Sequence, residues 1–443
     1  MLGRAWDTPA LPGERTAAGG DQDSLTLGIE AAFACLERAG TDDIDAIFFA
    51  TTTPPYAEKH AAATIAAVLD RRDVGTVDVT GSLRAATTAL RNALDAVRAG
   101  SARAALVVAA DMRPAEPSTA MEQLFGDGAA AVLVRPDAPV RVLGEASVAE
   151  EFTGPWRRTG DPFVRTFDAK IETEQYQRAV VEVSQRALDR AGVSPDAIAA
   201  FAAYAPDPRT YASVAKRIGI AQARDPLFAG AGNLGAAHAL ASLAGALDEA
   251  APGDHVLLAA GAEGADALVL AAAEGVQRAR AARTLNDALA DKRMLASYER
   301  YVRARRLIEW DDPVVPSSTI RTWRDRRQAF ALYGVRCGAC ELVQFPANRA
   351  CIACGGDRMT PQRLQRTGAV FTYTLDHLVA GEYLETPVPR MVVDLDGGGR
   401  VFVEGTDCEP SDVTVGMRVE LCFRLMHEGA DFKNYYWKAR PER

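Results

Sequence analysis

Four cysteines in one short segment have the spacing of a metal site. Cys337 and Cys340 are separated by two residues, as are Cys351 and Cys354, and ten residues lie between the two pairs. A gap of two residues lets both sulfurs of a tight turn face one ion, and Zn²⁺ prefers four thiolates in a closed tetrahedral shell. The alternatives are disulfides or chance spacing. The quartet predicts a structural zinc site, which by itself performs no chemistry.

Length, composition and charge limit the classes of protein to consider. The chain has 443 residues, of which 48% are hydrophobic and 25% charged, with a net charge of −9. This length allows two or three domains, and the acidic balance argues against a nucleic-acid partner. No stretch of about twenty apolar residues lacks charge, so no membrane span is expected. Residues 1–20 contain no apolar signal core, and we therefore expect a cytoplasmic protein.

The first 275 residues contain two segments of similar sequence, which indicates an internal repeat. Residues 35–40 read CLERAG and residues 187–192 read ALDRAG, an offset of 152 residues. Each follows an amphipathic helical pattern and precedes an apolar run, at 44–53 and 197–205. The alternative is a chance likeness between alanine-rich units. The pattern predicts a duplicated α/β domain with halves at 1–140 and 141–275.

The remainder of the chain has a different pattern. A charged helical linker is predicted at 276–330 and the zinc ribbon at 331–362. Residues 363–443 contain five short strand-like runs, with a hairpin signal at Asp396-Gly397. The runs lie at 369–375, 390–396, 400–404, 417–425 and 435–438. They predict a small OB-type barrel, and another small β-sandwich is the alternative.

Sequence motifs in both parts resemble known families. Residues 1–275 resemble the thiolase superfamily, in particular ketoacyl synthase III and hydroxymethylglutaryl-CoA synthase. The stretches that carry this likeness are AIFFATTTPPYAEKHAAATIAAVL (46–69), FGDGAAAVLV (125–134), AYAPDPRTYASVAKRIGI (203–220), AGNLGAAHAL (231–240) and APGDHVLLAAGAEGADALVL (251–270). The stretches VRCGACELVQFPANRACIACGG (335–356), TGAVFTYTLDH (367–377) and VEGTDCEPSDVTVGMRVELCF (403–423) resemble the zinc-ribbon and OB-fold family that accompanies thiolase-like enzymes acting on acyl-CoA.

The resemblance implies a multidomain fold. We expect a thiolase-like αβαβα layered duplication, followed by a zinc ribbon and a five-stranded OB-fold β-barrel. The thiolase-like family begins with a β-strand before its first helix, and residues 1–20 show no clear strand. Such proteins pair through the edge of the central strand in each half. A homodimer, or a heteromer with another thiolase-like chain, is therefore the implied assembly.

The nucleophile that the resemblance implies is absent. In the family a cysteine lies five residues after an aspartate, at the N-terminus of a buried helix that lowers the thiol pKa. Here the aspartate is Asp78 and the fifth residue after it is Leu83, which cannot be acylated. Ser82 is adjacent, but we expect the start of a helix to direct its side chain elsewhere.

Two of the three other family positions also carry different residues. Thr52 occupies the position of the synthase acid, Tyr204 that of the histidine, and Asn233 matches the asparagine. The internal repeat supports these assignments, because Thr52 and Tyr204 fall on equivalent loops of the two halves. Residues predicted to contribute to substrate binding are His238, Gly232, Gly261 and Gly264, with Glu58, Lys59 and His60 on a nearby loop. The alternatives are that Tyr204 fills space, that His238 packs on the core, and that Glu58 and His60 are solvated.

Three readings remain after the cysteine route is excluded, and two of them concern acyl-CoA. We favour an enzyme, lyase- or acyltransferase-like, that makes or breaks a carbon–carbon bond in a CoA thioester by retro-aldol or Claisen-type chemistry. Tyr204 would act as acid or base, and Asn233 would donate to the enolate oxygen. The alternative is a non-catalytic scaffold that binds acyl-CoA and assembles with an active thiolase or synthase. An enzyme should keep an open polar pocket between Tyr204 and Asn233, whereas a scaffold should have it filled.

The resemblance also defines the expected ligands. Zn²⁺ is the structural metal, and a CoA thioester or an acyl group on a carrier is the small-molecule ligand. Nucleic-acid binding by the OB barrel is a third reading, which the acidic composition disfavours.

Overall fold

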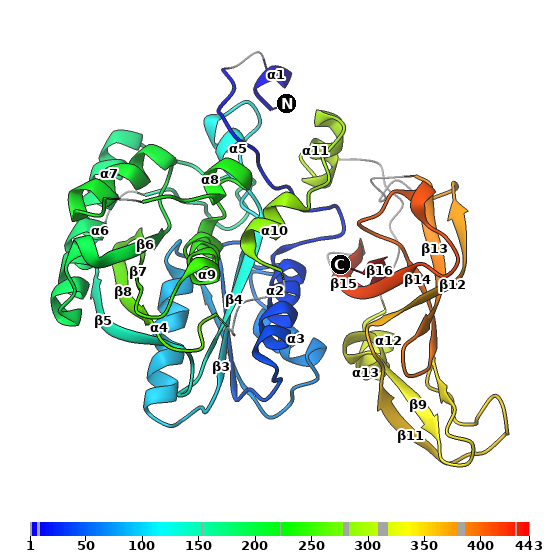
Figure 1. The fold of residues 1–443 in the computed structure, drawn as a ribbon. Helices are drawn as coiled ribbons and strands as arrows, with labels where there is room; N and C mark the ends of the chain where they lie inside the picture. Colours follow the sequence, from blue (N-terminus) through cyan, green and yellow to red (C-terminus); the bar gives the residue numbers. More distant parts are fainter. Residues whose placement is uncertain are drawn as a thin grey trace. The chain divides into compact units, whose positions relative to one another are not determined.

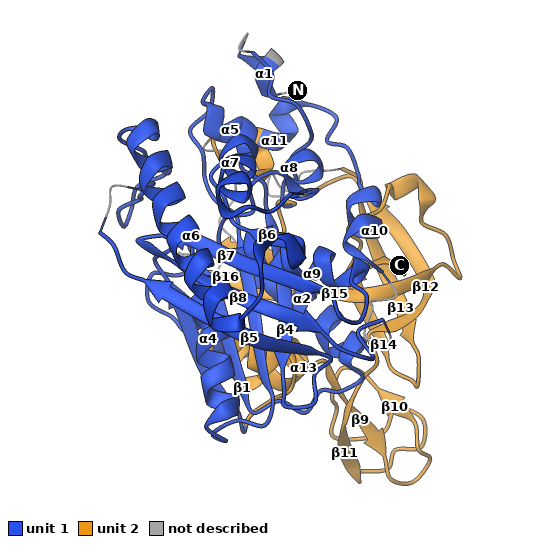
Figure 2. Ribbon diagram, turned by 60° about the vertical axis from the view of Figure 1, so that its left-hand side comes forward, with its two compact units in different colours: residues 1–18, 23–63, 73–301 blue, residues 19–22, 64–72, 302–443 orange. Residues whose placement is uncertain are grey.

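The structure is a computed structural model that divides into two compact units (Figure 2). It describes residues 2–6, 9–151, 154–221, 223–277, 283–308, 318–379, 386–429 and 432–442. Unit 1 comprises residues 1–18, 23–63 and 73–301, and unit 2 comprises residues 19–22, 64–72 and 302–443. In the described part of the chain, no helix combines the length and the apolar character needed to cross a bilayer.

Two four-stranded sheets form the framework of unit 1 (Figure 1). The first has the order β2-β1-β3-β4, with β1 parallel to β2 and β3, and β4 antiparallel to β3. Its strands are β1 (Ala46–Thr51), β2 (Gly75–Thr80), β3 (Ala105–Asp111) and β4 (Gly128–Val134). The second has the order β5-β8-β7-β6. Its strands are β5 (Val140–Val148), β6 (Ile198–Ala203), β7 (His255–Ala262) and β8 (Gly264–Ala272).

Helices form layers between and outside the two sheets. Helices α4 (Ala85–Arg98) and α9 (His238–Glu249) contact strands of both sheets, so they form the middle layer. Helix α2 (Ser24–Ala39) covers β3 and β4, and α6 (Ala169–Ala191) covers β5, β7 and β8. The other helical segments of unit 1 are α1 (Leu2–Ala5), α5 (Ala120–Leu124), η1 (Pro195–Ala197), α7 (Pro208–Ile218), α8 (Leu227–Gly230), η2 (Gly235–Ala237), α10 (Leu285–Ala290) and α11 (Tyr298–Ala304). Helix α3 spans Ala61–Val68.

The two halves repeat each other element by element, which confirms the predicted layered duplication. Strands β1, β3 and β4 match β6, β7 and β8 in order and direction. Helices α2 and α6 begin at the aspartate N-caps Asp23 and Asp168 and end at the left-handed glycines Gly40 and Gly192. Two strands lack a counterpart, namely β2 in the first half and β5 in the second. Residues 9–20 form no strand, as the sequence predicts.

Unit 2 contains the zinc ribbon and the barrel. The ribbon is a three-stranded sheet of β9 (Tyr333–Cys337), β10 (Val343–Gln344) and β11 (Met359–Arg363), preceded by α12 (Thr319–Arg324) and α13 (Arg326–Ala331). The barrel strands are β12 (Thr367–Asp376), β13 (Val388–Leu395), β14 (Arg400–Glu404), β15 (Arg418–Gly429) and β16 (Phe432–Pro441), with η3 at Pro410–Asp412. All five strand-like runs are therefore confirmed. Residues 278–282 and 309–317 of the predicted linker lie outside the described residues.

The barrel is an antiparallel sheet that closes on itself. Its strand order is β14-β13-β12-β15-β16, and a bridge between Gly405 and Ala439 joins the two edge strands. Met391, Phe423 and Trp437 are almost fully buried inside it. Closure removes exposed edges, which explains how such short strands hold together.

Candidate active site and metal centre

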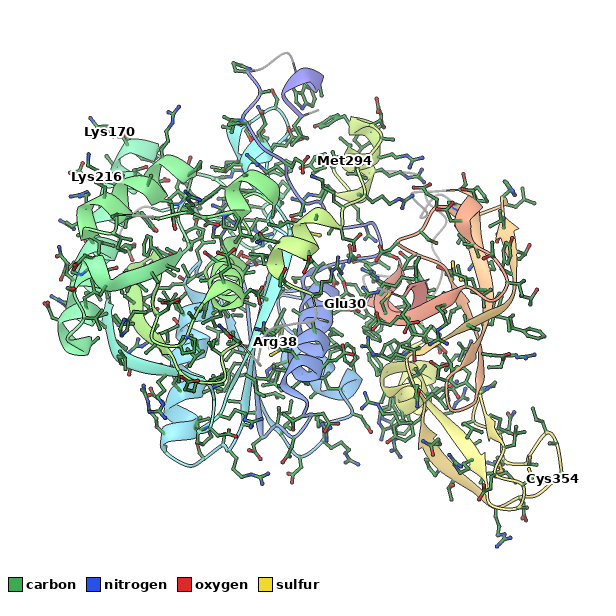
Figure 3. The ribbon with its side chains drawn as sticks, viewed as in Figure 1. Glu30, Arg38, Lys170, Lys216, Met294 and Cys354 are labelled. Carbon is green, nitrogen blue, oxygen red and sulfur yellow. The ribbon has the colours of Figure 1, made fainter. Side chains whose placement is uncertain are left out.

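The four predicted cysteines come together in the ribbon. Their sulfur atoms all lie within 4.8 Å of one another, with 3.6 Å between Cys337 and Cys354 and 3.5 Å between Cys340 and Cys351. A tetrahedral Zn²⁺ with Zn–S bonds of about 2.3 Å needs sulfurs roughly 3.8 Å apart. The quartet therefore fits zinc. Figure 3 shows Cys354 in the loop region of the ribbon, away from its strands.

Backbone N–H groups favour the thiolate form of two of these cysteines. The N–H groups of Cys340 and Ala339 donate toward Cys337 and lower the pKa of its thiol to about 6. The N–H groups of Cys354 and Ala353 likewise lower the pKa of Cys351. Because zinc binds the thiolate form, this knuckle geometry favours metal binding.

The structure brings Tyr204 and Asn233 into direct contact. Tyr204 follows β6, and its phenol oxygen receives hydrogen bonds from Asn233 and Arg113. The side-chain amide of Asn233 also donates to the carbonyls of Ala205 (3.1 Å) and Pro206 (3.0 Å). Tyr204 is 3% exposed and Asn233 is 1% exposed. These two side chains therefore bond to each other rather than flanking a solvent-filled gap.

Asp111, at the end of β3, links this cluster to Thr52. Its buried carboxylate accepts from the backbone N–H and hydroxyl of Thr52 (2.6 and 2.8 Å) and from the backbone N–H of Ala236 (2.7 Å). The hydroxyls of Thr51 (2.9 Å) and Thr53 (3.1 Å) also donate to it. Five hydrogen bonds thus join the loop after β1 to the start of η2. Sequence reasoning missed Asp111 and Arg113, although a charged residue directly after a fully apolar strand is a usable signal.

Leu83 lies in the apolar core rather than in a polar pocket. It is 7% exposed and belongs to the same hydrophobic cluster as Tyr204. The hydroxyl of the adjacent Ser82 donates to Glu263 at 2.7 Å, in an exposed position. Asp78 accepts from the backbone N–H groups of Ala61 (2.7 Å) and Ala62 (2.8 Å), so its carboxylate serves the first turn of α3.

The remaining predicted residues have identifiable local contacts. Nδ1 of His238 accepts from the N–H of Leu234 (3.2 Å), so Nε2 carries the proton and donates to Asp225 (2.7 Å). Both ring nitrogens of this fully buried histidine are therefore occupied. His60 lies 3.4 Å from Asp78, Lys59 lies over the ring of Tyr56, and Glu58 is exposed.

Three predicted glycines lie where a neighbouring backbone or side-chain atom leaves little room for a Cβ. A Cβ on Gly232, whose φ is +94°, would lie 2.8 Å from the carbonyl oxygen of Leu124. On Gly261 it would lie 2.6 Å from Val180, and on Gly264, with φ +91°, 2.1 Å from the carbonyl oxygen of Val148. Packing alone therefore requires glycine at these positions. Their predicted contribution to substrate binding stays a prediction.

The chemistry available at Tyr204 is that of a proton donor. Burial raises the pKa of the Tyr204 phenol above its ordinary value, against the opposing effects of Arg113 and of the hydrogen bond from Asn233. The side chain is therefore a neutral phenol at physiological pH. It can donate a proton to a developing oxyanion, but it cannot start a reaction as a base.

This assignment predicts the alkaline titration of the protein. The difference in tyrosinate absorbance between wild type and Tyr204→Phe should show no ionisation near pH 10, where an ordinary tyrosine titrates. Because the folded pKa is raised, the stabilisation is fully present below the unfolded pKa and is lost as pH rises toward the folded pKa. A difference transition near pH 10 would show that Tyr204 is not desolvated.

Family comparisons match three parts of the chain. Residues 77–149 match the family described as 3-oxoacyl-[acyl-carrier-protein] synthase III. Residues 324–360 match the ChsH2 rubredoxin-like zinc ribbon domain, and residues 361–424 match the ChsH2 C-terminal OB-fold domain. The thiolase-like, zinc-ribbon and OB-fold parts expected from the sequence are thereby confirmed, and the cysteine quartet is the metal centre of a zinc ribbon.

Solved structures give the same fold for the first part. A hydroxymethylglutaryl-CoA synthase complexed with CoA aligns with a TM-score of 0.60 at 19% identity, covering 72% of this chain and 89% of that one. 3-Oxoacyl-(acyl carrier protein) synthase III of Pseudomonas aeruginosa aligns with a TM-score of 0.57 at 24% identity, covering 62% and 92%. At these identities the likeness establishes the fold alone.

Two curated relatives establish the families. The hydroxymethylglutaryl-CoA synthase of Aeropyrum pernix is 30% identical over 295 residues, which is 63% of this chain and 82% of that protein. A DUF35 domain-containing scaffold protein of Methanocaldococcus jannaschii is 32% identical over 126 residues, which is 28% of this chain and 89% of that protein. The chain therefore belongs to the hydroxymethylglutaryl-CoA synthase family and carries in addition a region of the DUF35-domain family.

Proposed function

We propose that this protein handles acyl-CoA thioesters as an assembly partner of a cysteine-dependent thiolase or synthase, and that it forms no acyl-enzyme itself. The observation that carries the proposal is the apolar, buried Leu83 at the position where the family resemblance places the nucleophile. The burial of Tyr204 and Asn233, which are 3% and 1% exposed and whose side chains contact each other, supports it, because little of either side chain is open to a substrate.

The relatives support both parts of this proposal. The synthases act on CoA thioesters according to their name, and one solved synthase holds CoA. The M. jannaschii relative of the ribbon and barrel is named a scaffold protein. This chain contains both a thiolase-like domain and a ribbon and barrel. Their fusion fits a protein that binds a thiolase-fold partner and holds the complex together.

The test combines binding and turnover measurements on the full-length protein. Calorimetry with acetyl-CoA and acetoacetyl-CoA, with free CoA as the control, measures binding. Light scattering measures complex formation with a cysteine-containing thiolase or synthase from the same organism. We expect a stable complex, and no consumption of either thioester by this chain alone. Turnover by the chain alone, or failure to associate with each thiolase-fold enzyme of that organism, would contradict the proposal.

A second candidate function rests on the guanidinium of Arg113 beside the phenol of Tyr204. Arg113 is 3% exposed, and both it and Asn233 bond the phenol oxygen, so a proton donor lies within a buried polar cluster. Such a donor could protonate the oxyanion formed in an aldol-type condensation of a CoA thioester. With acetyl-CoA as donor and a panel of aldehydes and ketones as acceptors, Tyr204→Phe should then lower the condensation rate roughly 10²–10⁴-fold. An unchanged rate in this variant would exclude Tyr204 as the acid.

A further inference from the structure

Strand β4 has an edge without a partner strand. In the second sheet, the equivalent strand β8 lies between β7 and β5. In the first sheet β4 pairs with β3, and within the described ranges no other strand pairs with it. The burial differs accordingly, because five of the seven β4 residues are half-buried, whereas eight of the nine β8 residues are fully buried. The first half therefore has an open edge at the position where the second half has strand β5.

Contacts at the start of β4 identify which backbone groups face this edge. The N–H of Asp127 donates to the carbonyl of Thr16 (3.1 Å), and the hydroxyl of Thr16 donates to the carbonyl of Asp127 (2.6 Å). Both main-chain groups of Asp127 thus point away from β3. Backbone groups alternate along a strand, so those of Ala129, Ala131 and Leu133 point the same way. Outside the β3–β4 ladder, these three residues have no backbone partner among the described residues.

The second half of the duplication indicates what such an edge binds. Strand β5 runs antiparallel to β8, from the Val140–Ala272 pair to the Val148–Ala265 pair. Strand β4 has the sequence GAAAVLV and carries no charge, so a complementary strand needs small or apolar, uncharged residues over about seven positions. Extended segments that add to a sheet edge bind mainly through main-chain hydrogen bonds.

We propose that the open edge of β4 is a docking site for an antiparallel, uncharged β-strand supplied by a partner chain. The strand would begin beside Val134 and end beside Gly128, where Thr16 already occupies the next position on the edge. It would complete a five-strand sheet in the first half. The proposal goes beyond the function proposed above, because it depends on sheet topology and not on the chemistry at Leu83 or Tyr204.

Hydrogen exchange of the full-length protein tests whether the edge is open. Amides of Ala129, Ala131 and Leu133 should exchange roughly tenfold or more faster than those of β8 that bond to β5. Equal protection of the two strands would overturn the proposal. Protection in β4 that rises with protein concentration alone would also overturn it, because the occupant would then be a second copy of this chain.

A synthetic peptide with the sequence of residues 138–149, which contains β5, tests the occupant when Arg141→Thr and Glu145→Thr remove its two charges. We expect saturable binding by fluorescence anisotropy, with slowed exchange at Ala129, Ala131 and Leu133. Ala131→Pro removes one outward N–H and should weaken binding about tenfold without lowering the melting temperature. The matched control Ala130→Pro removes an N–H that faces β3 and should destabilise the fold. No peptide binding, or equal destabilisation by both prolines, would overturn the proposal.

Discussion

Replacing Cys337 with serine is expected to abolish zinc binding and to unfold the ribbon. The segment has a sheet of only three short strands, and Cys337 and Cys351 are the buried members of the quartet. Structural zinc sites bind with an apparent free energy of about 10–16 kcal/mol, which is also folding free energy in such small modules. Losing one thiolate of four therefore removes the main source of stability in this segment.

Metal analysis together with limited proteolysis measures this effect. Wild type should contain one zinc per chain, and Cys337→Ser should lose it and become sensitive to protease between residues 337 and 356. Cys35→Ser is the matched control, because Cys35 lies in α2 and outside the quartet. Retention of zinc by Cys337→Ser, or an intact ribbon after chelation, would contradict a closed Cys₄ site.

Replacing Asp111 with alanine is expected to cause a large loss of stability in unit 1. The change leaves the backbone amides of Thr52 and Ala236 without an acceptor in a buried location. An unsatisfied buried amide costs about 1–3 kcal/mol, so the free energy of unfolding should fall by roughly 2–6 kcal/mol.

Chemical denaturation of the purified variants checks this value. Asp137→Ala is the control, because Asp137 is exposed and pairs with Arg135 on the surface, where an ion pair contributes little. If the free energy of unfolding fell as little for Asp111→Ala as for Asp137→Ala, the hydrogen bonds of Asp111 would not hold the loops at Thr52 and Ala236 together. Asp111→Asn should fall between them, since the amide keeps the shape but replaces one acceptor with a donor.

Much of the fold follows from local sequence patterns. The cysteine quartet, the five barrel strands and the duplicated α/β order were predictable, because each depends on spacing or on hydrophobic periodicity over a few residues. The caps Asp23 and Gly40, and their counterparts Asp168 and Gly192, show how local signals repeat with the duplication. The lack of a strand among the described residues before α2 could also be read from the polar, glycine-containing residues 1–20.

The connections within the candidate site depend on the tertiary fold and were less predictable. Asp111 reaches Ala236 across 125 residues, and Arg113 reaches Tyr204 only because β3 and β6 end near each other in the folded chain. His238 was predicted to contribute to substrate binding, with packing on the core as the alternative, and its bond to Asp225 depends on a loop whose path the sequence does not encode in any short pattern. The direct Tyr204–Asn233 contact likewise required the loop carbonyls of Ala205 and Pro206.

The intact mass of the protein after incubation with acetyl-CoA tests most directly whether the chain forms an acyl-enzyme. We expect wild type to keep its own mass, because Leu83 cannot accept an acyl group and Ser82 is bonded to Glu263. The double variant Leu83→Cys with Tyr204→His serves as positive control and should gain one acetyl group at residue 83. A stoichiometric acetyl adduct on the wild-type chain would contradict the account.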